Sequence, residues 1–73
     1  MITMMKGTIA RLEYEKGFGF ITPEGADGAD HFFNIRTMHV KSRGFHTLKV
    51  GDRVTFIATQ SEKGPRAVEV LAD

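Results

Sequence analysis

Two phenylalanines, Phe18 and Phe20, stand one residue apart in the segment that covers residues 16–21. In an extended strand alternate side chains point to the same face, so these two rings share one face and the neighbouring glycines share the other with Ile21. Glycine and isoleucine suit a close-packed core, which leaves both rings on the surface, near the cation of Lys16. Exposed rings beside a cation can stack against nucleic-acid bases. The segment therefore predicts a surface that binds single-stranded nucleic acid.

The same six residues fit the start of an aromatic pattern of RNA-binding modules, K/R-G-F/Y-G/A-F-V, with isoleucine in place of valine. A buried role is the alternative, because phenylalanine is usually found in cores. The alternation argues against it, since Ile21 already faces inward and Phe33 does the same in the following strand. We therefore expect Phe18, Phe20 and Phe32 on one exposed face.

The charges are unevenly distributed, although a net charge of +1 is too small to indicate a nucleic-acid partner by itself. Residues 36–49 carry lysines, arginines and histidines and no acid, whereas the acids gather at residues 13–15 and 24–30. Such asymmetry can produce a positive stripe on a nearly neutral molecule. A solvated loop whose lysines only maintain solubility would have the same composition, so charge alone leaves both interpretations open.

Length and composition indicate one small domain, which we expect over residues 4–73. The chain has no cysteine, so neither disulfides nor thiolate metal ligands are available. No apolar run approaches the roughly 18 residues of a membrane span, and the first six residues lack the apolar stretch of a signal peptide. We expect a soluble cytoplasmic protein without a membrane partner.

Short segments rich in strand-forming residues alternate with turn residues, and no segment shows a helical period over about 11 residues. Proline and glycine mark turns most densely at residues 23–28. Phe56 shares an apolar face with Val54 and Ala58, which assigns it to the core. The expected strands cover residues 5–13, 18–22, 30–35, 53–60 and 66–71, with one helical turn near residues 35–38. Five short strands with a long connection after the third favour an all-β closed barrel, in which no strand edge is exposed.

Five blocks of this sequence resemble the bacterial cold-shock domain family in their order and spacing. The blocks are Lys16–Ile21, Asp30–Phe33, Gly44–Leu48, Gly51–Phe56 and Gly64–Ala67. The resemblance implies a five-stranded antiparallel barrel of the oligonucleotide-binding (OB) fold. It also implies binding of single-stranded RNA or DNA with little sequence selectivity, and action as an RNA chaperone or regulator of transcription or translation.

Individual positions receive roles from the resemblance and from the residues themselves. The resemblance matches Phe18, Phe20, Phe32 and Phe45 to the family's stacking positions, so bases would stack on them. The cations expected near the phosphates are Arg11, Lys16, Arg43, Lys63 and Arg66. Base edges would be hydrogen-bonded by Asp30, whose position matches the family's, and by Asn34. Structural roles are the alternatives for three of these residues, because Phe45 could cap the barrel, Lys16 could be a solvated turn lysine and Asp30 could cap a turn.

The chain departs from the family pattern at four positions. Arg11 stands where the family usually has an exposed tryptophan, and Ala10 beside it where a lysine is common. Asn34 and Ile35 replace a histidine and an aromatic residue. Stacking is worth about 1–3 kcal/mol per base, so two lost partners predict weaker binding than in a typical member. A guanidinium plane also stacks on bases, so Arg11 could compensate in part.

Other function classes receive less support from the residues. The three histidines, His31, His39 and His46, lack the spacing of metal sites, and no nucleophile stands in a recognisable motif. We therefore expect a protein that is not an enzyme, with no metal, no cofactor and no small-molecule substrate. The main alternative is a diverged barrel that binds a protein partner through its aromatic face, since fold does not fix function. We expect a monomer, although the sequence leaves a dimer open.

Overall fold

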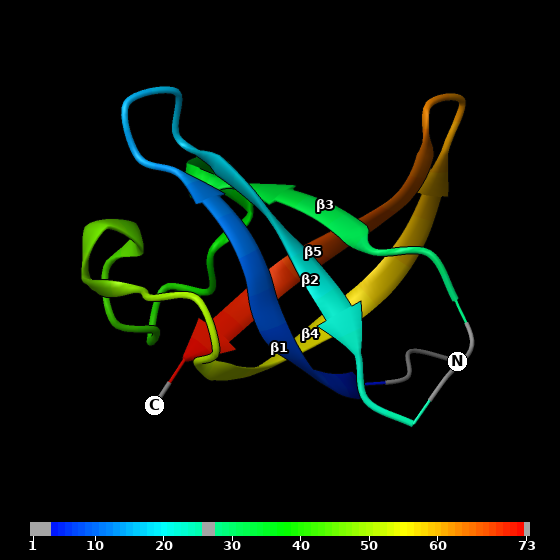
Figure 1. The fold of residues 1–73 in the computed structure, drawn as a ribbon, viewed down its shortest axis with the longest axis horizontal. Helices are drawn as coiled ribbons and strands as arrows, with labels where there is room; N and C mark the ends of the chain where they lie inside the picture. Colours follow the sequence, from blue (N-terminus) through cyan, green and yellow to red (C-terminus); the bar gives the residue numbers. More distant parts are fainter. Residues whose placement is uncertain (1–3, 26–27, 73) are drawn as a thin grey trace.

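The computed structural model describes residues 4–25 and 28–72, which form a closed barrel of five strands (Figure 1). The strands are β1 (Met4–Glu13), β2 (Phe18–Pro23), β3 (His31–Asn34), β4 (Arg53–Ser61) and β5 (Gly64–Ala72). Around the barrel they follow the order β1-β2-β3-β5-β4. The predicted all-β, five-stranded closed barrel is confirmed. All pairs are antiparallel except β3 with β5, which meet in parallel where Phe32 lies opposite Arg66.

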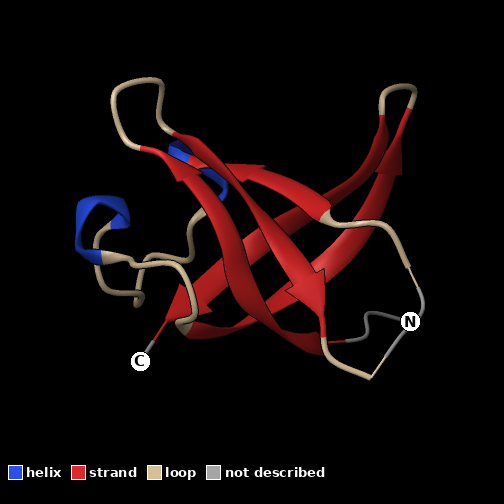
Figure 2. Ribbon diagram, viewed as in Figure 1, coloured by secondary structure: helices blue, strands red, loops and turns tan. Residues whose placement is uncertain are grey.

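Two short 3-10 helices interrupt the long connection between β3 and β4 (Figure 2). The first, η1 (Ile35–Thr37), is the helical turn expected near residues 35–38, and the Asn34 side chain caps it by accepting a hydrogen bond from the Arg36 N–H. The second, η2 (Phe45–Thr47), was not predicted. No helix in residues 4–25 and 28–72 is long and apolar enough to cross a membrane. Asp73, at the end of the predicted domain, and residues 26–27 of the predicted turn lie outside the described residues.

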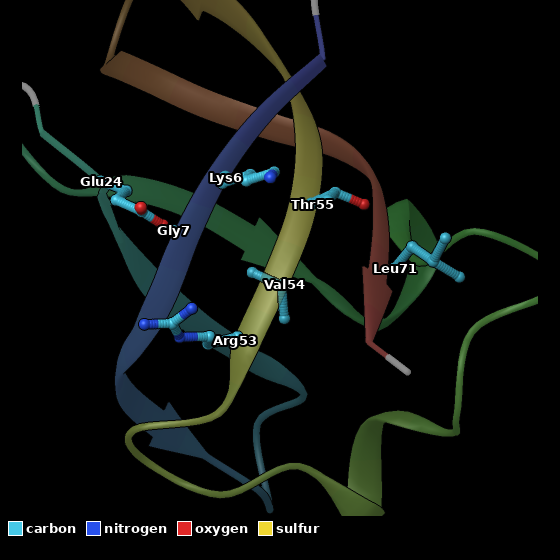
Figure 3. Close-up of a pocket in the computed structure, with 7 residues that line it drawn as sticks. All are labelled: Lys6, Gly7, Glu24, Arg53, Val54, Thr55 and Leu71. Carbon is cyan, nitrogen blue, oxygen red and sulfur yellow. The ribbon is translucent and has the colours of Figure 1, made fainter.

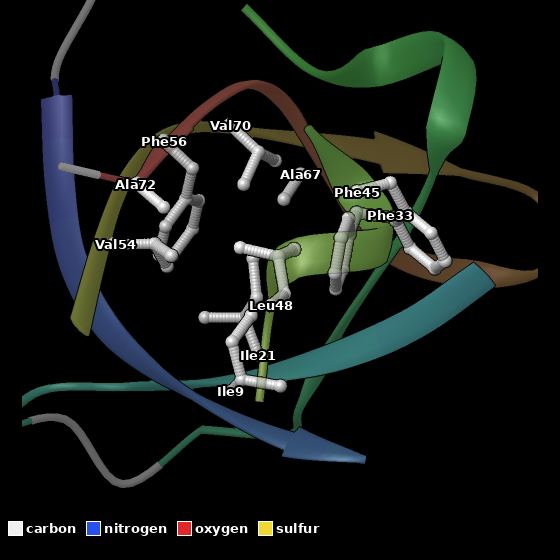
Figure 4. Packing of buried hydrophobic residues seen from close by; sticks show 10 residues of the cluster. All are labelled: Ile9, Ile21, Phe33, Phe45, Leu48, Val54, Phe56, Ala67, Val70 and Ala72. Atoms are coloured by element: carbon white, nitrogen blue, oxygen red, sulfur yellow. The ribbon is translucent and has the colours of Figure 1, made fainter. Parts of the chain in front are cut away.

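A single cluster of buried apolar side chains fills the barrel (Figure 4). Its members are Ile9, Ile21, Phe33, Phe45, Leu48, Val54, Phe56, Ala67, Val70 and Ala72. The predicted alternation is confirmed in β2 and β3, since Ile21 and Phe33 are 0% exposed. Phe56 is also fully buried, as its place on an apolar face predicts. Ala58, on the same expected face, is instead exposed, because β4 pairs with β1 only as far as Ile57 and continues beyond it in the β4–β5 hairpin.

Gly19 allows β1, β2 and β3 to pack closely at the centre of the sheet. A Cβ atom at this position would lie 2.5 Å from the Arg11 carbonyl oxygen and 2.9 Å from the Phe33 ring. Glycine is therefore required for close approach, as the sequence pattern indicated. Gly17 has a different role from the one expected, because it lies in the turn before β2 with a φ of +73°. That left-handed conformation, rather than packing beneath the rings, accounts for glycine there.

Among the described residues, His31 is the only polar or charged residue that is buried, with 9% of its surface exposed. Its ring lies 5.4 Å from the Phe56 ring, and its Nδ1 atom is buried without a hydrogen-bond partner in the described part of the chain. A buried polar atom left unpaired costs about 1–3 kcal/mol. The inward orientation agrees with the alternation of β3, in which Phe32 and Asn34 point outward.

We predict that His31→Val stabilises the barrel, since valine favours strands and has no polar side-chain atom to leave unpaired. The expected gain in the free energy of unfolding is about 1 kcal/mol, because the smaller valine loses part of the packing that the imidazole ring makes. Urea denaturation of both proteins measures this difference. A clear loss of stability would show instead that packing of the imidazole against Phe56 outweighs the unpaired nitrogen.

Candidate nucleic-acid interface

Three phenylalanine rings, Phe18, Phe20 and Phe32, form a cluster on the outer surface of β2 and β3. The ring centroids are 5.6 Å apart for Phe18 and Phe32, 5.7 Å for Phe20 and Phe32, and 6.1 Å for Phe18 and Phe20. The first pair is stacked and the other two are edge-to-face, which are the arrangements that aromatic pairs favour. Each residue is half-buried, so the rings support one another while their outer surfaces meet solvent. We call these three rings the aromatic platform.

Strand register brings the platform together. Phe20 lies directly opposite Phe32 in the pairing of β2 with β3, and Phe18 lies opposite Asn34. Residues directly opposite each other in an antiparallel pair share a face and have Cβ atoms about 5 Å apart. The two inward neighbours, Ile21 and Phe33, anchor the same strands in the core. The platform is therefore held by the same packing that closes the barrel.

A β-bulge places Arg11 beside the platform. The pairing of β1 with β2 joins Ile9 to Ile21 and then Arg11 to Phe20, so Ala10 is the extra residue. Without the bulge, Arg11 would share the inward face of Ile9, two residues before it. With the bulge, Arg11 lies directly across from Phe20 and is exposed. The family resemblance placed Arg11 at this surface, whereas the alternation pattern alone would have pointed it into the barrel.

Glu13 binds the guanidinium group of Arg11. Its Oε2 atom accepts hydrogen bonds from Arg11 Nε at 3.1 Å and from Arg11 Nη2 at 2.9 Å. Glu13 itself lies opposite Phe18, so an acidic side chain borders the platform. This pair was not predicted from the sequence, although a spacing of two residues along a strand places both side chains on one face. The carboxylate therefore offsets part of the positive charge of Arg11 at this surface.

A groove of about 330 Å³ runs along the other side of the platform, beside the β4–β5 hairpin. Phe20 and Phe32 line one wall, and Lys63 and Arg66 are among the residues of the other. The Arg66 guanidinium carbon lies 4.8 Å from the centre of the Phe32 ring, a cation–π contact. The groove therefore combines aromatic faces with two cations, as a strand of stacked bases with a phosphate backbone requires.

The remaining predicted polar residues lie at the ends of the same strands. Lys16 is exposed in the turn that leads into β2. Asp30 is exposed just before β3, and its Oδ1 accepts a hydrogen bond from Thr22 Oγ1 at 2.8 Å. Asn34 uses its Oδ1 to cap η1, so its amide nitrogen is the part of the side chain left to meet a base edge. The structure thus gives Asn34 and Asp30 structural contacts, and their role at base edges stays a prediction.

Phe45 does not belong to the platform, which corrects the expectation that bases stack on it. The residue is 3% exposed and lies in the core, 5.8 Å from the Phe33 ring between centroids (Figure 4). Helix η2 turns its side chain inward, and the Tyr14 ring covers it edge-on at 6.2 Å. The alternative reading, in which Phe45 caps the barrel, describes its position. No strand pattern in the polar loop indicated this burial, because it depends on a 3-10 turn.

Arg43 is engaged at a different part of the molecule from the platform. Its Nη2 atom binds Asp52 Oδ2 at 3.1 Å, and its Nη1 atom donates to the Thr47 carbonyl oxygen at 3.0 Å. Its backbone N–H donates to Ala72, at the end of β5 and six residues beyond Arg66. These contacts hold the loop that carries Phe45 against the barrel. Arg43 was predicted to lie near the platform, but the structure places its contacts in this loop instead.

Asp52 is the carboxylate to which Arg43 binds. Hydrogen bonds from the Lys49 backbone N–H and from the Arg43 guanidinium lower the pKa of Asp52 below its ordinary value of 3.8. A lowered pKa in the folded state means that folding favours the ionised carboxylate. Its contribution to stability is present above the unfolded pKa and is lost as the pH falls through the folded pKa.

A second hollow, of about 190 Å³, lies on the β1–β4 side of the barrel (Figure 3). Two cations, Lys6 and Arg53, line it together with the acidic Glu24 and with apolar and small residues of β1, β4 and β5. No aromatic ring is among the described residues that line it. Its chemistry is therefore unlike that of the groove beside the platform, which is larger and has two ring faces in its wall.

This chain belongs to the cold-shock domain family. The family described as "'Cold-shock' DNA-binding domain" matches residues 5–72. Cold shock protein CapB of Pseudomonas syringae pv. tomato is 44% identical over 70 residues, which are 96% of each chain. Cold shock-like protein CspE of Escherichia coli K12 is 41% identical over 71 residues, covering 97% of this chain and 99% of that protein.

A solved structure has the same fold. The chain is similar to drosophila Unr CSD456 with a TM-score of 0.74 and 28% sequence identity, over 97% of this chain. The match spans only 27% of that longer chain. Together with the strand order, this confirms the OB-fold barrel that the resemblance implied.

We predict that Asp52→Asn lowers stability at neutral pH, because a neutral amide is a weaker acceptor for Lys49 and Arg43. The difference between the two proteins should shrink as the pH falls below 3.8 and the wild-type carboxyl becomes protonated. Urea denaturation across that range measures it. A difference that stays constant at all pH values would mean that the charge of Asp52 does not matter.

Proposed function

We propose that this protein binds single-stranded RNA or DNA with low sequence selectivity and acts as an RNA chaperone or regulator of transcription or translation. The observation that carries the proposal is the aromatic platform, three mutually supporting rings on the outer face of a barrel whose interior is already filled. Membership of the cold-shock domain family supports it independently. No catalytic step is part of the proposal.

Bases stack on the outer faces of Phe18, Phe20 and Phe32. Every base has a π-face, so this contact tolerates any sequence. Arg11, Lys16, Lys63 and Arg66 surround the platform and contact phosphates. Asp30 and the amide nitrogen of Asn34 offer hydrogen bonds to exposed base edges. With four cations we expect the affinity to depend modestly on salt. The slope of log affinity against log salt concentration should be at most about −0.7 for each phosphate neutralised.

Binding of this kind opens RNA structure without an energy source. A strand whose bases lie on the platform cannot pair, so occupancy shifts a hairpin toward its open state by mass action. The reaction needs no cofactor, metal or small-molecule substrate. We propose that the protein acts in the cytoplasm, in agreement with a chain that has no cysteine. We also propose that it acts as a monomer, because the site is contained in one barrel.

We predict that Phe20→Ala weakens binding of a labelled octauridylate by between about 5-fold and 100-fold, the range expected for loss of one stacked base. The barrel should remain folded, because the ring lies outside the core. Fluorescence anisotropy measures the affinity and circular dichroism the fold. Val50→Ala, at a residue that is 66% exposed in the β3–β4 connection, is the matched control and should bind like the wild type.

An unfolded Phe20→Ala protein would place the ring in the core and contradict the platform. A folded variant that binds with wild-type affinity would exclude Phe20 from the interface. Absence of binding by the folded wild-type protein at low salt would refute the proposed function itself, and would favour a protein partner for the aromatic face.

We predict that Glu13→Gln strengthens binding by about 2-fold to 5-fold, because it releases the Arg11 guanidinium from an exposed ion pair. The slope of log affinity against log salt concentration should also become steeper by up to about 0.7, the contribution of one further phosphate contact. Anisotropy titrations at several salt concentrations give both numbers. Arg11→Gln is the matched control and should change the slope in the opposite direction. Unchanged affinity and slope in both variants would exclude Arg11 from the interface.

A further inference from the structure

A second pair of stacked rings, Tyr14 and His46, lies outside the platform. Their centroids are 6.4 Å apart and their planes differ by 23°. Tyr14 is 42% exposed, and His46 is also exposed. The pair joins two segments far apart in sequence, the turn between β1 and β2 and helix η2, which lie on the same side of the barrel (Figure 1).

The Tyr14 ring is held in a fixed orientation. Its hydroxyl donates a hydrogen bond to the carbonyl oxygen of Leu48, a residue buried in the core. Its ring also makes an edge-to-face contact with Phe45, which is buried as well. A ring fixed in this way loses little conformational entropy when a ligand stacks on it. Anchoring of the loop explains the hydrogen bond and the contact with Phe45, but it does not require the residue to be as exposed as it is.

The Tyr14–His46 pair lies beyond the Phe18 end of the platform. Glu13 pairs with Phe18 across β1 and β2, and Tyr14 is the next residue along the chain. The same turn ends at Gly17, whose carbonyl oxygen accepts the N–H of Ile35, the residue after Asn34 in η1. The turn is thus fastened to the end of β3 that borders the platform. A strand lying on the three phenylalanines and continuing past Phe18 reaches this turn.

We propose that the Tyr14–His46 pair is an additional stacking site for a base of the same single strand. It takes the role that the sequence assigned to Phe45, which the Tyr14 ring covers. Glu13 and Glu15 flank Tyr14, so the site offers stacking rather than attraction for phosphate. This inference rests on the proposed function, because the strand must first occupy the platform.

The chain supplies its own reporter for this site. Tyr14 is the sole tyrosine and the protein has no tryptophan, so its intrinsic emission comes from the proposed site alone. We expect a saturating octauridylate, within the range of about 4–16 nucleotides per OB fold, to quench that emission. Anisotropy of an end-labelled octauridylate reports binding to the protein as a whole, independently of Tyr14.

Two substitutions separate stacking from anchoring. Tyr14→Leu fills the space against Phe45 without a π-face, whereas Tyr14→Phe keeps the ring and removes only the hydroxyl. We expect Tyr14→Leu to weaken octauridylate binding by between about 5-fold and 100-fold with an unchanged salt slope. Tyr14→Phe should bind within about 3-fold of the wild type, since stacking does not need the hydroxyl. Circular dichroism checks the fold of both variants.

Binding by anisotropy without quenching of Tyr14 would overturn this inference and leave the proposed function intact. So would wild-type affinity in the folded Tyr14→Leu variant. A salt slope that changes with Tyr14→Leu would show that the residue acts through the charges around it and not by stacking. Absence of any binding by the wild-type protein would refute the proposed function, and the additional site with it.

Discussion

The close packing of Phe33 beneath Gly19, with Ile21 in the same core, is the constraint on which the rest of this structure depends. These inward residues of β2 and β3 help to fill the barrel, and a side chain at position 19 would collide with the Phe33 ring and the Arg11 carbonyl oxygen. Because side chains alternate along a strand, this packing turns Phe18, Phe20 and Phe32 to the outside. A shift of one residue in register would bury the rings and expose the core. The aromatic platform is therefore a consequence of how the barrel closes.

Alternation and turn chemistry were sufficient to predict the five strands, the outward rings and the core position of Phe56, because these depend on local pattern. Features that depend on irregular backbone were not predictable in the same way. The bulge at Ala10 turns Arg11 outward, and the 3-10 turn of η2 carries Phe45 into the core. Both depend on contacts between distant segments. Family resemblance placed Arg11 correctly and misplaced Phe45, whose ring packs against Phe33 and Tyr14 in this structure.

The interface relies more on stacking than on charge. The net charge is only +1, Glu13 already binds Arg11, and Arg43 is committed to Asp52 and Thr47. Arg66 lies over the Phe32 ring, so it supports the aromatic surface as well as offering a charge. Such a surface holds single strands through base faces that every sequence has, with limited long-range attraction. That balance suits the proposed binding of single strands with low sequence selectivity.

The most direct test of this account uses the six phenylalanines of the chain, which the structure divides equally between surface and core. Aromatic proton–carbon NMR spectra, recorded during titration with octauridylate, report on each ring separately. Stacking of bases on the aromatic platform predicts large shifts for Phe18, Phe20 and Phe32 and small ones for the buried rings Phe33, Phe45 and Phe56. Binding that shifts the buried rings most, or that leaves the three outer rings unchanged, would contradict it.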